Sequence, residues 1–366
     1  MAAQPQNVTG LLPAGEPVRF VAEDGTAGPP PPGYTEPSPE RLREAYRRMV
    51  LGRRFDTQAT ALTKQGRLAV YPSAAGQEAC QIAAALALRD DDWLFPTYRD
   101  SMALVARGLD PVQLMELLRG TWHCGYDPHA TFTAPQCTPL ATQTLHAAGL
   151  ADAIRRRGEE RVVLALIGDG GTSEGDFHEA LNFAAVFHVP VVFFVQNNGF
   201  AISVPLAKQT RAPALAYKGV GYGVASEQVD GNDLVAVLSV LDHAVAHARR
   251  GGGPFLVEAH TYRMDAHTNA DDATRYRDAA EVERWRAADP VRRLETHLRE
   301  RGVLTEEDVA ADAAAAEEFA AGFRARMNAE PEVDPLGLFA HVYAEPTRQL
   351  AAQRETLRAE LAAQEG

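Results

Sequence analysis

Two short polar motifs close two apolar runs near the middle of the chain. GDGG at 168–171 ends the run at 161–168, and QNNGF at 196–200 ends the run at 189–196. Glycine-rich backbone at the start of a helix lets N–H groups approach an anion closely. A carboxylate such as Asp169 repels a phosphate unless a metal ion lies between them, so the motifs indicate magnesium bridging Asp169 and a diphosphate. The spacing matches neither the dinucleotide pattern GxGxxG nor the phosphate loop GxxxxGK[ST].

Alternating strands and helices are expected to position both motifs. The run at 161–168 predicts a buried strand, 173–188 has helical periodicity, and 189–196 predicts a second strand, which together make a parallel βαβ unit. A helix at 231–251 and a strand at 254–263 repeat the alternation. We therefore expect an α/β fold with a doubly wound, mainly parallel sheet flanked by helices. Ligands of such sheets bind beyond the carboxyl ends of the strands, where both motifs fall.

The rest of the chain contains an arm, several helices and a long loop. Prolines at 29–32, 37 and 39 predict an extended arm, and Ser38-Pro39-Glu40 is a good helix start. The expected elements are a helix from there to Gly66, a helix at 76–89, a strand at 91–95, a turn at 97–100 into another helix, a structured loop at 120–140, and helices at 305–327 and 344–364. We expect an arm at 1–40, a binding domain at 41–300 and a C-terminal helical extension at 301–366.

Composition narrows the classes of partner. The 366 residues carry a net charge of −13, from 36 Lys and Arg against 49 Asp and Glu. This charge argues against nucleic acid or an anionic membrane as the main partner, because both need a basic face. Lysine occurs only at 64, 208 and 218, so a phosphate site should use arginine or backbone. Three widely spaced cysteines give no disulfide framework or zinc motif. No signal peptide or membrane span is evident, and a cytoplasmic protein is expected.

The combined motif resembles that of a known family. GDG, 26 residues (171–196) and NN resemble the thiamine diphosphate motif, and the text from 168 to 203 resembles the alpha subunit of the decarboxylating component of 2-oxo acid dehydrogenase complexes. The resemblance covers about residues 40–345 and continues in LFPTYRD (94–100), TPLATQ (138–143), VDGND (229–233) and TYRMDAHTNADDATRYR (261–277). SEGD, NNGFAIS, PLATQ and DDATRYR are closer to the branched-chain enzymes. The alternatives are the alpha subunit of a pyruvate or acetoin dehydrogenase and, from another class, a non-catalytic scaffold of the same fold.

The resemblance implies a thiamine-diphosphate-binding fold and a set of cofactor contacts. It assigns Mg²⁺ to the side chains of Asp169 and Asn198 and the carbonyl of Phe200. It assigns the diphosphate to Tyr98 and Arg99. The remaining cofactor contacts are Thr138 and Leu140 beside the aminopyrimidine, and the turn residues Gly168, Gly170 and Gly171, of which the last two donate backbone N–H groups.

The resemblance also implies a catalytic histidine. His267 is expected at the mouth of the cofactor channel, where it orients an incoming lipoyl group and donates a proton during acyl transfer. Thr268 stands where many relatives have a phosphorylatable serine, and Cys137 where relatives with a potassium site have serine. Kinase control and a potassium site therefore do not follow from the resemblance.

The implied activity needs other chains. It is the oxidative decarboxylation of a 2-oxo acid, with thiamine diphosphate as electron sink and a lipoyl acyltransferase core as acyl acceptor. The glutamate that activates the cofactor lies on a beta subunit in two-chain members of the family. We therefore expect a heterotetramer of two alpha and two beta chains, and an alpha chain that is inactive alone.

Overall fold

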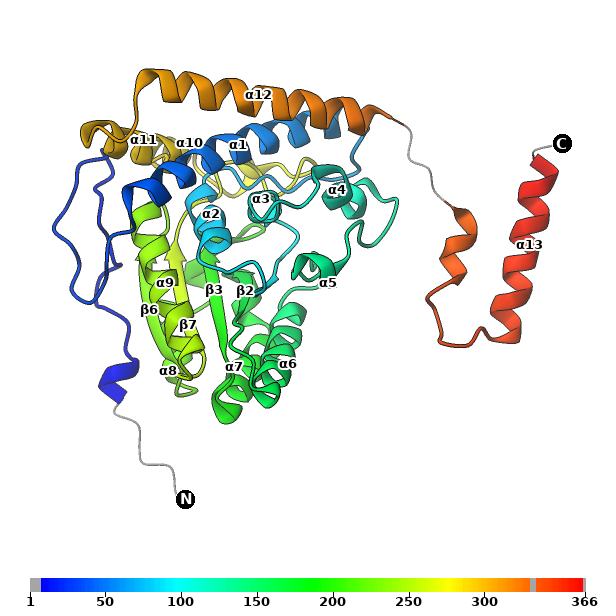
Figure 1. Ribbon diagram of the computed structural model, residues 1–366, viewed down its shortest axis with the longest axis horizontal. Helices are drawn as coiled ribbons and strands as arrows, with labels where there is room; N and C mark the ends of the chain where they lie inside the picture. The colour runs from blue at the N-terminus through cyan, green and yellow to red at the C-terminus, as the bar shows by residue number, and fades with distance from the viewer. Residues whose placement is uncertain (1–7, 330–333, 365–366) are drawn as a thin grey trace. The chain divides into compact units, whose positions relative to one another are not determined.

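A five-stranded parallel sheet forms the centre of the computed structural model, which describes residues 8–329 and 334–364 (Figure 1). Its strand order is β1-β2-β3-β7-β6, and every neighbouring pair is parallel. The strands are β1 (Trp93–Phe95), β2 (Val163–Gly168), β3 (Val191–Asn197), β7 (Phe255–His260) and β6 (Ala225–Asp230). The predicted parallel α/β sheet is thus confirmed. Strand β6 was not predicted, because its sequence ASEQVD is largely polar.

Helices cover both faces of the sheet, as expected of a doubly wound fold. Alternate residues of β2 point to opposite faces. Leu164 and Leu166 join the core under α2 (Glu78–Leu86) and α9 (Leu234–Arg249), whereas Ile167 joins the core under α6 (Thr142–Arg157) and α7 (Gly175–Phe187). Figure 1 shows these helix pairs on opposite sides of the strands. Strands β2 and β3 are buried on both faces and consist mostly of apolar residues, which is why the sequence predicted them.

Helices α6 (Thr142–Arg157) and α7 (Gly175–Phe187) pack side by side on one face. The sequence predicted α7 but not α6. The buried side of α6 consists largely of small residues such as Ala147, Ala148 and Ala151, which give weak hydrophobic periodicity. The structured loop predicted at 120–140 contains one short helix, α5 (Pro128–Thr131).

An outer layer of helices lies over α2. Helix α1 (Pro39–Lys64) begins where Ser38 caps the N–H of Arg41, and the chain leaves it through Gly66 at φ 69°. Helix α12 (Glu306–Asn328) runs along α1 (Figure 1). The other elements of this part are α3 (Ser101–Ala106), α4 (Pro111–Arg119), α8 (Tyr217–Val220), α10 (Ala279–Ala287), α11 (Pro290–Glu300) and the short pair β4 (Phe200–Ala201) and β5 (Val204–Pro205).

The described part of the N-terminal arm packs against the outer edge of the sheet. Val18 forms a parallel bridge with Val229 of β6, and Val18, Phe20 and Val21 are buried. The carboxylate of Asp233 accepts the backbone N–H groups of Phe20 and Val21. The arm therefore covers an edge strand that would otherwise expose unpaired backbone groups.

The compact unit extends through Met327, and a second unit begins at Asn328. The second unit contains α13 (Arg348–Gln364), which confirms a helix within the predicted range 344–364. Within the described ranges, no helix is long and apolar enough to cross a membrane.

Candidate active site

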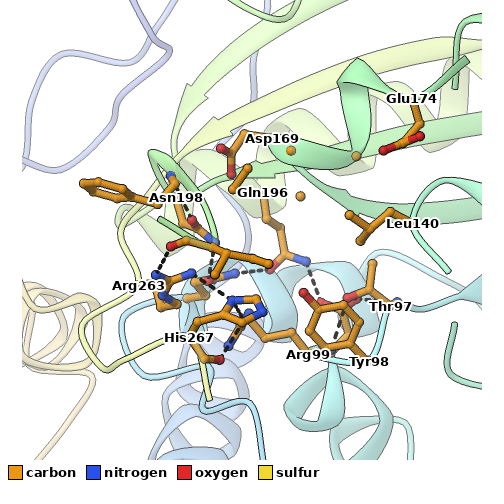
Figure 2. A pocket seen from close by; sticks show the side chains of 18 residues that line it. Thr97, Tyr98, Arg99, Leu140, Asp169, Glu174, Gln196, Asn198, Arg263 and His267 are labelled. Carbon is orange, nitrogen blue, oxygen red and sulfur yellow. Dashed lines mark hydrogen bonds between the residues drawn. The ribbon is translucent and has the colours of Figure 1, made fainter. Parts of the chain in front are cut away.

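A cavity of about 200 Å³ opens at the carboxyl ends of β1, β2 and β3 (Figure 2). It also takes in residues of the chain that follows β7. All but one of the predicted site residues line it: Tyr98, Arg99, Leu140, Gly168, Asp169, Gly170, Gly171, Asn198, Phe200 and His267. Thr138 is exposed and does not line the cavity. The structure thus brings together residues from five separate segments of the chain, as expected for the carboxyl edge of a parallel sheet.

The turn after β2 requires its glycines. The chain passes from Gly168 through a 3₁₀ turn at Gly170–Ser173 into α7. A Cβ atom added at Gly170 would lie 2.6 Å from Ala201 Cβ, and one at Gly171 would lie 2.7 Å from Ile167 Cγ1. Neither position has room for a side chain, so bare backbone faces the cavity there.

One side of the cavity presents oxygen atoms, and we call Asp169, Asn198 and Phe200 the oxygen side. Asp169 is 1% exposed, and burial raises the pKa of its carboxyl group although Gln209 Nε2 donates to Oδ2 at 2.7 Å. Asn198 Nδ2 donates to Gln77 Oε1 at 3.1 Å, and its Oδ1 accepts the Phe200 N–H at 3.3 Å. Figure 2 shows Asp169 and Asn198 on the same side of the cavity.

These donors fit a magnesium ion that also binds phosphate. Nowhere in residues 8–329 or 334–364 do three His, Cys, Asp or Glu side chains form a cluster that could hold a metal by themselves. One carboxylate, one amide and one carbonyl form a hard oxygen set that leaves places for phosphate oxygens, which is how Mg²⁺ is usually held.

The other side is positively charged, and we call Arg99, Arg263 and His267 the cationic side. Arg99 is 6% exposed and Arg263 is 1% exposed. Arg99 Nη2 and Arg263 Nη1 lie 3.0 and 3.1 Å from His267 Nδ1. Arg99 Nη1 also donates to the carbonyl of Ser73 at 2.7 Å, and Arg263 Nη2 to the carbonyl of Ile202 at 2.8 Å.

In the part of the chain that the structure describes, no carboxylate forms a salt bridge with either guanidinium group. Asp100 follows Arg99 directly, but its carboxylate instead accepts from Thr97 and Gln196. Two buried arginines without a direct salt bridge to a carboxylate favour an anionic ligand, and the planar guanidinium group suits a diphosphate.

Burial and the two neighbouring arginines keep His267 neutral. Burial and then the charges of Arg99 and Arg263 lower the pKa of His267 from 6.5 to about 4. Because guanidinium groups only donate hydrogen bonds, Nδ1 must accept, which places the ring proton on Nε2. The backbone N–H of His267 donates to Asp271 Oδ2 at 2.8 Å, and its ring meets the Tyr98 ring edge-on at 6.1 Å.

Of the lining residues that were not predicted from the sequence, three make contacts that bear on the site: Gln77, Gln196 and Arg263. Gln77 Nε2 donates to Gln196 Oε1 at 3.2 Å, and Gln196 Nε2 donates to Asp100 Oδ1 at 2.6 Å, so the two amides join Asn198 to the loop after β1. Gln196 is a polar residue at the end of an apolar strand, and Gln77 precedes an apolar helix. A polar residue at the end of an apolar segment was the sequence feature that could have identified both glutamines as site residues. Arg263 lies in the stretch TYRMDAHTNADDATRYR (261–277), but the sequence indicated no role for it.

Comparison with known proteins identifies the family. The family model described as "Dehydrogenase E1 component" matches residues 46–325. The chain belongs to this family. The dehydrogenase E1 family depends on thiamine diphosphate, and alpha-subunit members form part of an alpha/beta E1 component that works with an acyltransferase.

Named relatives share most of their length with this E1 chain. It is 47% identical over 347 residues to the 3-methyl-2-oxobutanoate dehydrogenase subunit alpha of Mycobacterium tuberculosis (strain ATCC 25618 / H37Rv), covering 95% of each chain. It is 39% identical over 321 residues to the pyruvate dehydrogenase E1 component subunit alpha of Acholeplasma laidlawii, covering 86% of this chain and 92% of the relative. The corresponding subunit of Staphylococcus aureus (strain COL) is 39% identical over 269 residues, 73% of each chain.

Proposed function

We propose that this chain is the alpha subunit of a thiamine-diphosphate-dependent dehydrogenase of branched-chain 2-oxo acids, with 3-methyl-2-oxobutanoate as a substrate. The observation that carries the proposal is the meeting of an oxygen side and a cationic side in one cavity beyond the carboxyl ends of the strands. The 47% identity to a 3-methyl-2-oxobutanoate dehydrogenase subunit alpha supports the choice of substrate.

Each side of the cavity has a proposed role in holding the cofactor. Asp169, Asn198 and the carbonyl of Phe200 would hold Mg²⁺, while Tyr98 and Arg99 would bind the diphosphate. Backbone N–H groups of Gly170 and Gly171 would add donors, with Leu140 and Thr138 beside the aminopyrimidine. When bound, thiamine diphosphate supplies the electron sink for loss of carbon dioxide from the 2-oxo acid.

His267 would act at the acyl-transfer step. Its neutral ring carries the proton on Nε2 because Nδ1 is occupied by the two arginines. That N–H would orient the lipoyl group and donate to it during transfer. An anion near Arg99 and Arg263 would offset their charge and raise the pKa of His267, which would increase the population of the imidazolium form that can transfer a proton.

The proposed enzyme is a heterotetramer of two alpha and two beta chains that acts with a lipoyl acyltransferase core. The cofactor-activating glutamate is assigned to the beta chain, so the alpha chain alone should not turn over substrate. We place the enzyme in the cytoplasm.

The second candidate is the alpha subunit of a pyruvate or acetoin dehydrogenase, favoured by the 39% identity to two pyruvate dehydrogenase alpha subunits. Steady-state assays of the reconstituted alpha and beta chains decide between these functions. We expect a higher kcat/KM for 3-methyl-2-oxobutanoate than for pyruvate. A higher kcat/KM for pyruvate would overturn the substrate assignment. If the assembled chains show neither cofactor binding nor turnover, a non-catalytic scaffold is favoured.

A further inference from the structure

A buried polar cluster lies outside the cavity, beneath the loop that carries His267. Ser73 Oγ is 2.7 Å from Asp56 Oδ2 on α1 and also 2.7 Å from Asp265 Oδ2, two residues before His267. Asp56 is 3% exposed and Ser73 is 5% exposed, whereas Asp265 is exposed. We call Asp56, Ser73 and Asp265 the Ser73 cluster. It joins two carboxylates through one hydroxyl group.

The hydrogen atoms in this cluster can be counted. The other oxygen of Asp56, Oδ1, accepts from Tyr71 OH and the Ala74 N–H, each at 2.8 Å. Ser73 has one hydroxyl hydrogen and can donate it to only one carboxylate at a time. If both carboxyl groups are ionised, one close oxygen pair contains no hydrogen, and two oxygens at that distance repel each other. One additional proton removes this conflict.

We propose that the Ser73 cluster holds a shared proton and that this proton fastens the His267 loop to the body of the subunit. Asp56 Oδ2–H donates to Ser73 Oγ, and the Ser73 hydroxyl donates to the ionised carboxylate of Asp265. Ser73 Oγ also accepts the Ala75 N–H at 3.2 Å, so the hydroxyl then donates one hydrogen bond and accepts two. Asp56, Ser73 and Asp265 are positioning residues, because they act through the loop.

The segment that contains Ser73 also supports two side chains of the cationic side, Arg99 directly and His267 through Arg99. The Ser73 carbonyl accepts from Arg99, which in turn contacts His267. The backbone N–H of Met264 donates to the Ala75 carbonyl at 2.9 Å, close to where the loop begins. The cluster therefore adds a side-chain contact between the segment around Ser73 and the loop that carries His267. The proposed mechanism depends on the relative position of these two segments. Its relevance to catalysis rests on the role proposed for His267.

The proton makes the contact depend on pH. Burial raises the pKa of Asp56 from 3.8 to about 6, and the nearby charge of Glu78 acts in the same direction. Within the cluster, Asp265 is the second titratable group, and the other titratable or charged groups that face the cluster are Tyr71 and Arg99. Because the folded-state pKa lies above the ordinary value, the stabilisation is complete below about pH 4 and is lost as pH rises through about 6.

An isosteric variant supplies the missing hydrogen permanently. In Asp56→Asn, the amide oxygen can accept from Tyr71 and Ala74 while the amide N–H donates to Ser73, without any proton to lose. Asp265→Asn supplies an N–H from the opposite end, and its exposed position keeps the risk of misfolding low. Ser73→Ala removes the bridge and should loosen the loop at every pH.

Hydrogen exchange of the segment 264–272, measured in the assembled alpha and beta chains without substrate, tests the proposal. We compare wild type and variants at equal pH, so that the intrinsic pH dependence of exchange cancels. At pH 5 the wild type and Asp56→Asn should exchange alike. At pH 7.5 the wild type should exchange about tenfold faster than Asp56→Asn, as loss of one hydrogen bond to a charged group implies.

A ratio that stays near one at both pH values, or faster exchange in Asp56→Asn, overturns the proposal. If Asp56→Asn does not fold, the same ratios measured for Asp265→Asn decide. Because exchange is read without turnover, this result is independent of the substrate assay. An enzyme that prefers pyruvate could still show the predicted exchange, and a branched-chain enzyme could fail to show it.

Discussion

The two sides of the cavity carry opposite charges, and burial acts on each in the opposite direction. On the oxygen side, burial raises the pKa of Asp169. On the cationic side, burial and two arginine charges lower the pKa of His267 to about 4. In both cases the surroundings disfavour the charged form of the titratable group. A cation beside Asp169 and an anion beside Arg99 and Arg263 would reverse both effects, so magnesium diphosphate is complementary to the whole cavity.

The first and largest expected effect tests the oxygen side alone. Asp169 is the only carboxylate among the proposed metal ligands, so Asp169→Ala should lower the affinity for thiamine diphosphate with Mg²⁺ by about 1,000-fold. Calorimetry of the assembled enzyme measures this change. Asp176→Ala, in the first turn of α7 and outside the cavity lining, is the matched control and should bind normally. Binding within about tenfold of wild type would refute the metal assignment.

The second prediction separates the chemistry of the cationic side from binding on the oxygen side. His267→Asn should lower acyl transfer to lipoyl by about 100-fold, because it removes a positioned proton donor. Decarboxylation with an artificial electron acceptor should fall much less, since the proposed metal ligands Asp169 and Asn198 are unchanged. His260→Asn, at the end of β7 and outside the cavity, serves as control. Equal losses in the two assays would contradict the role given to His267.

The third and smallest effect concerns the pKa of His267 itself. Inorganic diphosphate should raise this pKa by about one pH unit, because an anion near Arg99 and Arg263 favours the imidazolium form. NMR titration of the histidine ring measures the change, and Asp169→Ala should leave the ligand-free value near 4. An unchanged or lowered pKa on saturation with diphosphate would show that the anion binds elsewhere.

The same pKa fixes how His267 affects folding stability. Its folded-state pKa is depressed, so its contribution is present above about pH 6.5 and is lost as pH falls through about 4. The Ser73 cluster behaves in the opposite way, since its contribution is lost on the alkaline side. The two groups therefore destabilise the same loop at opposite ends of the acidic range.

Much of the fold could be predicted because the central strands are buried on both faces. Continuous apolar runs identified β2 and β3, and the helical periodicity between them identified α7. Strand β6 was not predicted because its buried positions include two polar residues. The Ser226 hydroxyl donates to the nearby carbonyl of Val224, and the Gln228 amide donates to the carbonyl of Ala14 in the N-terminal arm. Helix α6 was not predicted because its buried face consists largely of small alanines, which give little hydrophobic periodicity.

The sequence by itself determined the residue types that chemistry requires, namely a carboxylate among glycines, an amide after the next strand, an arginine and a histidine. Motif spacing carries that information for the carboxylate and the amide, because residues at the ends of neighbouring parallel strands must meet at one edge. The arginine and the histidine were assigned through the resemblance to the family. Only the tertiary structure brought Gln77, Gln196 and Arg263 into the cavity and placed Ser73 between two carboxylates. These contacts join segments far apart in the chain, and their distances, burial and pKa values follow from packing rather than from any local pattern.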